Sequence, residues 1–126
     1  MNSLLHRLCF VAAGCCILAP ASALVDLASA VLPSSRSVQV GDTATAFATL
    51  INTGSATALG CDIAPAAPLS ATFTYQTTDP ATNLLTGTAN TPADIAPGGS
   101  QSFVFAITPD APVDPIELEL VFDCTN

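Results

Sequence analysis

The side chains that most often carry out chemistry are scarce in this 126-residue chain. It has one His, His6, and two basic residues, Arg7 and Arg36, and it contains no Lys. Serine and cysteine nucleophiles need a neighbouring base, and histidine-based zinc and copper sites need imidazole ligands. From Leu24 onward neither His nor Lys is present, so Ser-His-Asp, Cys-His and Ser-Lys sites cannot be built there. We therefore expect a protein that is not an enzyme and has no cofactor.

Two sequence patterns resemble parts of the active sites of two different kinds of hydrolase. Leu50 to Gly54 (LINTG) resembles the active-site strand of retroviral-type aspartic proteases, but Asn52 stands where the catalytic Asp must be. Glu117 and Glu119 point to one face of a predicted strand, as a glycosidase pair would. The chain has no Trp and one Tyr to line a sugar cleft. An ordinary turn at Asn52 and a solvated strand face are the better interpretations.

The sequence contains one candidate metal site. Asp110, Asp114 and Glu117 lie in or beside a proline-rich loop. Loop carboxylates and backbone carbonyls are the hard oxygen ligands that calcium takes in extracellular modules. The alternative is a solvated acidic loop, because the sequence has no EF-hand pattern.

The charge of the chain is strongly negative. All ten carboxylates follow residue 23: Asp26, Asp42, Asp62, Asp79, Asp94, Asp110, Asp114, Glu117, Glu119 and Asp123. In the same part of the chain the one basic side chain is Arg36. Such a surface repels phosphate backbones and anionic lipid head groups, so we expect no nucleic-acid or membrane-surface partner.

Residues 1–23 have the pattern of a secretory signal peptide. His6 and Arg7 precede the apolar run Leu8 to Ala19, and Ala21-Ser-Ala23 forms a small-x-small cleavage site. The run is too short to span a bilayer, so we expect cleavage after Ala23, export, and no membrane span in the mature chain. A buried N-terminal helix is one alternative. A lipoprotein cut before Cys15 is another, since Ala12-Ala-Gly14 approximates a lipidation box.

Two cysteines follow the predicted cleavage site. Cys61 and Cys124 form an even set in a small exported domain, which predicts one disulfide bond rather than two free thiols.

Short runs of Thr, Val, Ile and Phe, broken every 8 to 12 residues by Gly, Pro, Asn and Asp, predict strands throughout residues 24–126. The expected strands are 26–32, 37–40, 43–51, 57–63, 71–78, 84–88, 101–108 and 116–123. A turn is expected at 95–100, and the best hairpin signal is the turn at 79–83 between 71–78 and 84–88. This spacing predicts one all-β domain, a two-sheet antiparallel sandwich of immunoglobulin-like type.

Alternation within the strands predicts which side chains are buried. Strand 43–51 has a small apolar face of alternating Ala residues, which suits a central strand approached closely by another sheet. Phe47 and Ile51 lie on its other face, and their exposure would mark a contact with a neighbouring domain or subunit. Strand 101–108 places Phe103 and Phe105 on one face, as core residues. The last strand is expected to point Ile116, Leu118, Leu120 and Phe122 inward.

Two segments resemble bacterial CARDB-type (cell-adhesion-related) domains. They are Val38 to Ala56, with VGD-T and N-T-G, and Ile95 to Phe105, with I-A-PG-G-S before a Phe strand. The resemblance covers roughly half of the chain after the signal and implies an immunoglobulin-like sandwich that serves as a spacer or binding module. This chain differs in being a lone copy that stops just after Cys124, so it is expected to be part of a longer protein.

The sequence thus favours an exported, non-catalytic module with a structural or adhesive role at the cell surface or in the periplasm, whose partner is unspecified. A calcium-binding or small-ligand module is the first alternative. The second is a pilus-like subunit that is completed by a strand from another chain.

Overall fold

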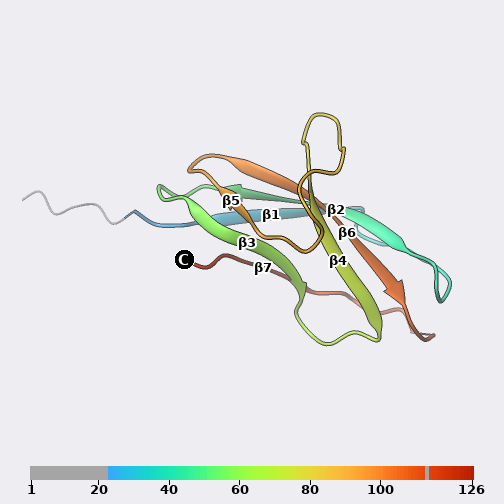
Figure 1. The fold of residues 1–126 in the computed structure, drawn as a ribbon. Coiled ribbons are helices and arrows are strands. Elements are labelled where there is room, and N and C mark those ends of the chain that lie inside the picture. The colour runs from blue at the N-terminus through green and yellow to red at the C-terminus, as the bar shows by residue number, and fades with distance from the viewer. Residues whose placement is uncertain (1–22, 113) are drawn as a thin grey trace, which may run out of the picture.

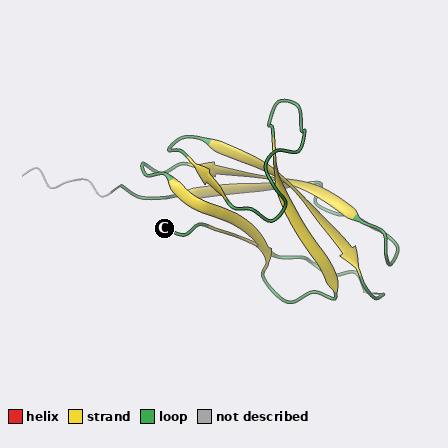
Figure 2. Cartoon of the chain, in the orientation of Figure 1, coloured by secondary structure: helices red, strands yellow, loops and turns green. Residues whose placement is uncertain are grey.

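A computed structural model describes residues 23–112 and 114–126, in which every regular element is a strand (Figures 1 and 2). The strands are β1 (Leu27–Leu32), β2 (Ala44–Asn52), β3 (Ala58–Pro65), β4 (Ala71–Thr78), β5 (Ala93–Ile95), β6 (Ser100–Pro109) and β7 (Leu120–Asp123). They form a four-stranded sheet, β1-β2-β6-β4, and a three-stranded sheet, β5-β3-β7, both antiparallel. The predicted two-sheet sandwich is confirmed. Residues 1–22 of the predicted signal peptide lie outside the described residues.

The core lies between the two sheets, where small and large side chains alternate across neighbouring strands. Ala46 and Ala48 of β2 pair with Phe105 and Phe103 of β6, and all four side chains are buried. The ring of Phe103 meets that of Tyr75 edge to face, with centroids 6.1 Å apart. The predicted Ala face and Phe face are therefore both confirmed, and together they let the sheets approach closely.

Asn52 is a fully buried polar side chain at the end of β2. Its Nδ2 donates to the carbonyls of Ala56 (2.7 Å) and Ile95 (2.9 Å), and its Oδ1 accepts from the amide of Gly54 (3.0 Å). These bonds fix the turn from β2 to β3 and attach it to β5. The residue at the position of the protease aspartate is thus a structural turn residue, as the sequence indicated.

Two predicted strands are absent and a third is shorter than predicted. Residues 37–40 form no strand, because Val38 and Val40 are exposed with no sheet to cover them. Residues 84–88 contribute a single bridge, from Leu85 to Thr78, because positive φ at Asn83 (59°) and Gly87 (62°) turns the chain out of the extended conformation.

The last strand begins at Leu120 instead of residue 116. Its partner β3 ends at Pro65, and the ladder closes with the bond from the amide of Ala66 to the carbonyl of Glu119 (2.9 Å). Ile116 is consequently exposed, contrary to the prediction that it points inward. Leu118, Leu120 and Phe122 are partly buried.

Strand β5, which has three residues and follows Pro92, was not predicted from the sequence. Its pairing is non-local, since Ile95 lies opposite Ala58 and Ala93 lies opposite Cys61. The turn predicted just after it is present, with the amide of Gly99 donating to the carbonyl of Ala96 (2.9 Å).

Candidate functional site

The outer face of the four-stranded sheet carries a row of solvent-exposed apolar side chains. Leu32 of β1 lies opposite Phe47 of β2, and Phe47 lies opposite Val104 of β6. Leu32 is 71% exposed, Phe47 is 40% exposed, and Val104 is partly buried. Ile51, on the same face of β2, is 42% exposed. The predicted exposure of Phe47 and Ile51 is confirmed, and we call the surface formed by Leu32, Phe47, Ile51 and Val104 the outer apolar row.

A shallow hollow adjoins this row. The residues around it come from β2, β4, β6 and the loop after β4: Thr45, Thr74, Tyr75, Gln76, Leu85, Ala89, Val104 and Ala106. None of them is charged at neutral pH: Tyr75, the one titratable residue among them, has its ring in the core against Phe103, and burial and, second, the negative charge of Asp62 raise the pKa of its phenol. The hollow can therefore bind by shape and apolar contact and has no group for proton transfer.

The loop formed by residues 79–92 makes the wall of the hollow and is held against the edge of β4. The amide of Thr86 donates to the carbonyl of Thr77 (2.8 Å). Asn90 continues this pattern with both its backbone and its side chain: its amide donates to the carbonyl of Tyr75 (2.7 Å), and its Oδ1 accepts from the amide of Tyr75 (3.0 Å). The loop thus covers this edge of the sheet without forming a regular strand.

Asp79 fixes the start of the loop. Its Oδ1 accepts from the amides of Ala81 (2.9 Å) and Thr82 (2.8 Å) and from the Thr82 hydroxyl (3.0 Å). The bonds from Thr82, first from its amide and then from its hydroxyl, lower the pKa of Asp79 below its usual value, and the bond from Ala81 adds to this shift. The ionised carboxylate is therefore part of the turn.

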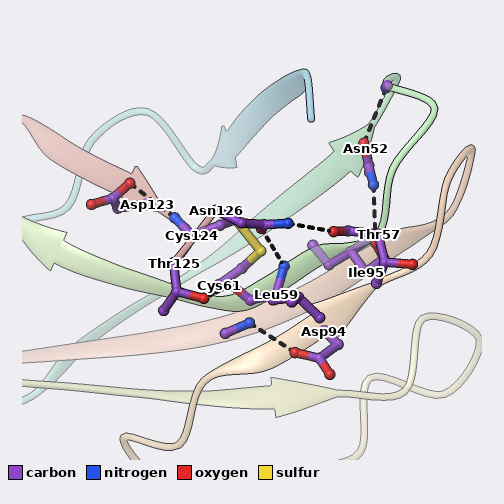
Figure 3. Close-up of a disulfide and its surroundings, with 12 residues drawn as sticks. Asn52, Thr57, Leu59, Cys61, Asp94, Ile95, Asp123, Cys124, Thr125 and Asn126 are labelled. Atoms are coloured by element: carbon purple, nitrogen blue, oxygen red, sulfur yellow. Dashed lines mark hydrogen bonds between the residues drawn. A yellow bond between two sulfur atoms is a disulfide. The ribbon is translucent and has the colours of Figure 1, made fainter. Parts of the chain in front are cut away.

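A disulfide joins Cys61 of β3 to Cys124, just after β7, with the Cα atoms 4.0 Å apart (Figure 3). The predicted disulfide is confirmed. Asn126 adds a second attachment, since its Oδ1 accepts from the amide of Leu59 (2.9 Å) and its Nδ2 donates to the carbonyl of Thr57 (2.9 Å). The final residues are thus fastened to β3 by covalent and hydrogen bonds.

The three predicted calcium ligands, Asp110, Asp114 and Glu117, are all exposed in the segment between β6 and β7. In residues 23–112 and 114–126, no group of three or more His, Cys, Asp or Glu side chains is placed to hold a metal ion. Calcium binding therefore stays a prediction that this geometry does not support. Glu119 is also exposed, and a shallow hollow is lined by Glu117, Leu118 and Glu119.

The part of the chain that the structure describes contains no helix long and apolar enough to cross a membrane. No protein-family model, curated protein or solved structure matches the chain.

Sequence reasoning found two members of the outer apolar row, Phe47 and Ile51, because their own strand alternates. It missed Leu32 and Val104, which join the row only through the pairing of β2 with β1 and β6. Val104 could have been suspected from its place between Phe103 and Phe105, since alternation puts it on the face opposite those core residues.

Proposed function

We propose that this chain is an exported, non-catalytic immunoglobulin-like module with a structural or adhesive role at the cell surface or in the periplasm, and that it binds a protein partner through the outer apolar row. The observation that carries this proposal is the alignment of Leu32, Phe47 and Val104 across three neighbouring strands. Exposed apolar residues that adjoin one another, with a hollow beside them, mark interaction surfaces in soluble proteins.

The sheet order supports the immunoglobulin-like part of the proposal. In immunoglobulin constant-type domains one sheet has the order A-B-E-D, and C pairs with F in the other. When β5 is left out of the count, β1-β2-β6-β4 follows this order and β3 pairs with β7; β5, on the other edge of β3, has no counterpart in it. The resemblance to CARDB-type domains rests on turns that the fold uses: Asn52 to Gly54 connects β2 to β3, and Gly98-Gly99 precedes β6.

Export is supported by the disulfide and by the first residues after the predicted cleavage site. Disulfides persist in oxidising compartments. The carbonyl of Leu24 accepts from the amides of Ser55 (2.8 Å) and Ala56 (3.1 Å), so a chain that began at Leu24 would have its first residue attached to the sandwich.

The absence of catalysis is supported by the residue types. The hollow beside the outer apolar row has no carboxylate, imidazole or amine around it. Among all residues after position 23, no His or Lys is available to act as a base.

In-cell photo-cross-linking tests the proposed surface. A photoreactive amino acid is placed at residue 47 or 51 of the exported protein in the cells that produce it natively, with Asp42, an exposed residue off the row, as the matched control position. We expect a discrete protein adduct from residues 47 and 51 that Leu32→Lys abolishes. Equal labelling from residues 42, 47 and 51 would overturn the proposal.

A further inference from the structure

Strand β7 ends the three-stranded sheet, and within residues 23–112 and 114–126 no other strand pairs with its outer edge. Its pairing with β3 places Val121 opposite Ala64 and Asp123 opposite Asp62, and Glu119 accepts the bond from the amide of Ala66. In an antiparallel pair, residues that bond to the partner alternate with residues that do not. Leu120 and Phe122 therefore direct their backbone N–H and C=O groups away from β3, toward the edge.

In the described part of the chain, the core is less completely covered beside this edge than elsewhere. On β1, the other strand at this side, Leu27 and Val31 are partly buried although they face inward. Ser29 is exposed although its partner Leu50, on the same inner face, is completely buried. In Figure 1 both β1 and β7 are faded, because they lie on the far side of the molecule in that view.

The opposite side of the sandwich is better closed. There the inward-facing Tyr75 of β4 is buried, and the loop formed by residues 79–92 bonds to the β4 edge through Thr86 and Asn90. Beside β7 the structure shows only a local bond in the described residues, from the amide of Cys124, just after the strand, to the Asp123 carboxylate (2.9 Å). The two sides of one small sandwich thus differ in both core burial and edge protection.

We propose that the β7 edge accepts an extended strand from a different protein, in which apolar residues alternate with Lys or Arg. The apolar residues would cover Leu27, Val31, Leu120 and Phe122, and the backbone would bond to Leu120 and Phe122. This site goes beyond the outer apolar row, which lies on the other face of the four-stranded sheet.

Charge identifies the chemistry of this strand. The side chains of β7 and its preceding residues that point outward include Glu119 and Asp123, and cross-strand neighbours of like charge repel. A second copy of this chain would bring no basic strand, since Arg36, the one basic residue in the part of the chain that the structure describes, lies outside all seven strands. A strand in which Lys or Arg alternates with apolar residues would bond to the backbone groups at the edge and would pair with the negative charges of Glu119 and Asp123.

Peptide binding tests the proposal on the exported, oxidised protein. The probe is a peptide of alternating Val and Lys, and its controls are a Val–Glu peptide and a scrambled peptide with the composition of the probe. We expect the probe to bind and to slow hydrogen exchange at the amides of Leu120 and Phe122. Two favourable cross-strand charge pairs predict binding roughly tenfold tighter than that of the Val–Glu peptide.

Two variants separate this site from the rest of the molecule. Leu120→Pro removes one edge-facing N–H that does not bond to β3 and should abolish the protection of the Phe122 amide, while Glu119→Gln with Asp123→Asn should remove the preference for Lys over Glu. Phe47→Lys, in the outer apolar row, should leave peptide binding unchanged, so that failure of either surface is seen separately. No protection at Leu120 and Phe122, or equal binding of the scrambled peptide, would overturn the proposal.

Discussion

At the residue scale, Asn52 shows how a side chain in an active-site-like motif can be entirely structural. Its amide and carbonyl groups make three hydrogen bonds while the residue is completely buried. The carbonyl of Ala56 lies in the turn and that of Ile95 lies in β5, so this one side chain links the turn to β5. A carboxylate at this position could not donate to either carbonyl.

Removal of this amide should therefore destabilise the whole sandwich. We expect Asn52→Ala to lower the free energy of unfolding by about 3 kcal/mol, because it leaves buried carbonyls unpaired. Urea unfolding followed by fluorescence of Tyr75 measures the change. Gln39→Ala, which truncates an exposed amide, is the control and should stay within about 0.5 kcal/mol of the native protein. A loss no larger than that of the control would contradict the structural role.

Asp79 gives a pH-dependent prediction at the same scale. Its pKa is lowered in the folded protein by bonds from Thr82 and Ala81. Its contribution to stability is consequently complete above the ordinary Asp pKa and is lost as the pH falls through the lower, folded-state pKa. NMR titration should place the pKa of Asp79 below that of a model peptide.

A variant of Thr82 apportions this shift. Thr82→Ala removes the hydroxyl donor but keeps both backbone amides, so the pKa of Asp79 should rise only part of the way to its ordinary value. A pKa of Asp79 that does not move would mean that the hydroxyl of Thr82 contributes nothing to the shift. A pKa that returns fully to the ordinary value would mean that the two backbone amides contribute nothing. Either result would contradict the description above.

At the scale of elements, the disulfide holds the short last strand in place. It closes a loop of 63 residues, and the four residues of β7 pair with β3 alone. In the chain-entropy description, a loop of this length contributes about 4 kcal/mol by restricting the unfolded chain. The bonds between Asn126 and Leu59 of β3, and between Asn126 and Thr57 just before β3, depend on the same attachment.

We expect Cys61→Ala with Cys124→Ala to lose about 4 kcal/mol of unfolding free energy. The same variant should show faster hydrogen exchange at the amides of Leu59 and Thr125, which bond between β3 and the final residues. Reduction of the native protein is the matched control and should give a similar loss. A change below about 1 kcal/mol in both experiments would mean that β7 is held by packing alone.

The elements differ in how far the sequence could predict them. Strands β1, β2, β3, β4 and β6 were predicted within two residues at each end, because turn residues bound each of these apolar or alternating runs. Residues 84–88 alternate less clearly, and positive φ at Gly87 decides their conformation. The pairs that create β5 and the outer apolar row join residues distant in sequence, such as Ala58 with Ile95, and no local pattern encodes them.

At the scale of the whole molecule, the sandwich has two contrasting sides and one exposed apolar face. The side at β4 is closed by a loop, and in the described part of the chain the side at β1 and β7 is less completely covered. Acidic residues are spread over the surface, which favours solubility and disfavours self-association by like-charge repulsion. A partner is therefore expected to bring apolar side chains to the outer face and basic ones to the β7 edge.

The intact mass of the exported protein, with and without thiol alkylation, tests the central claim that this is an exported, oxidised module. We predict the mass of residues 24–126 with one disulfide, unchanged by the alkylating agent until a reductant opens Cys61 and Cys124. Retention of residues 1–23, a lipid on Cys15, or alkylation without reductant would contradict it.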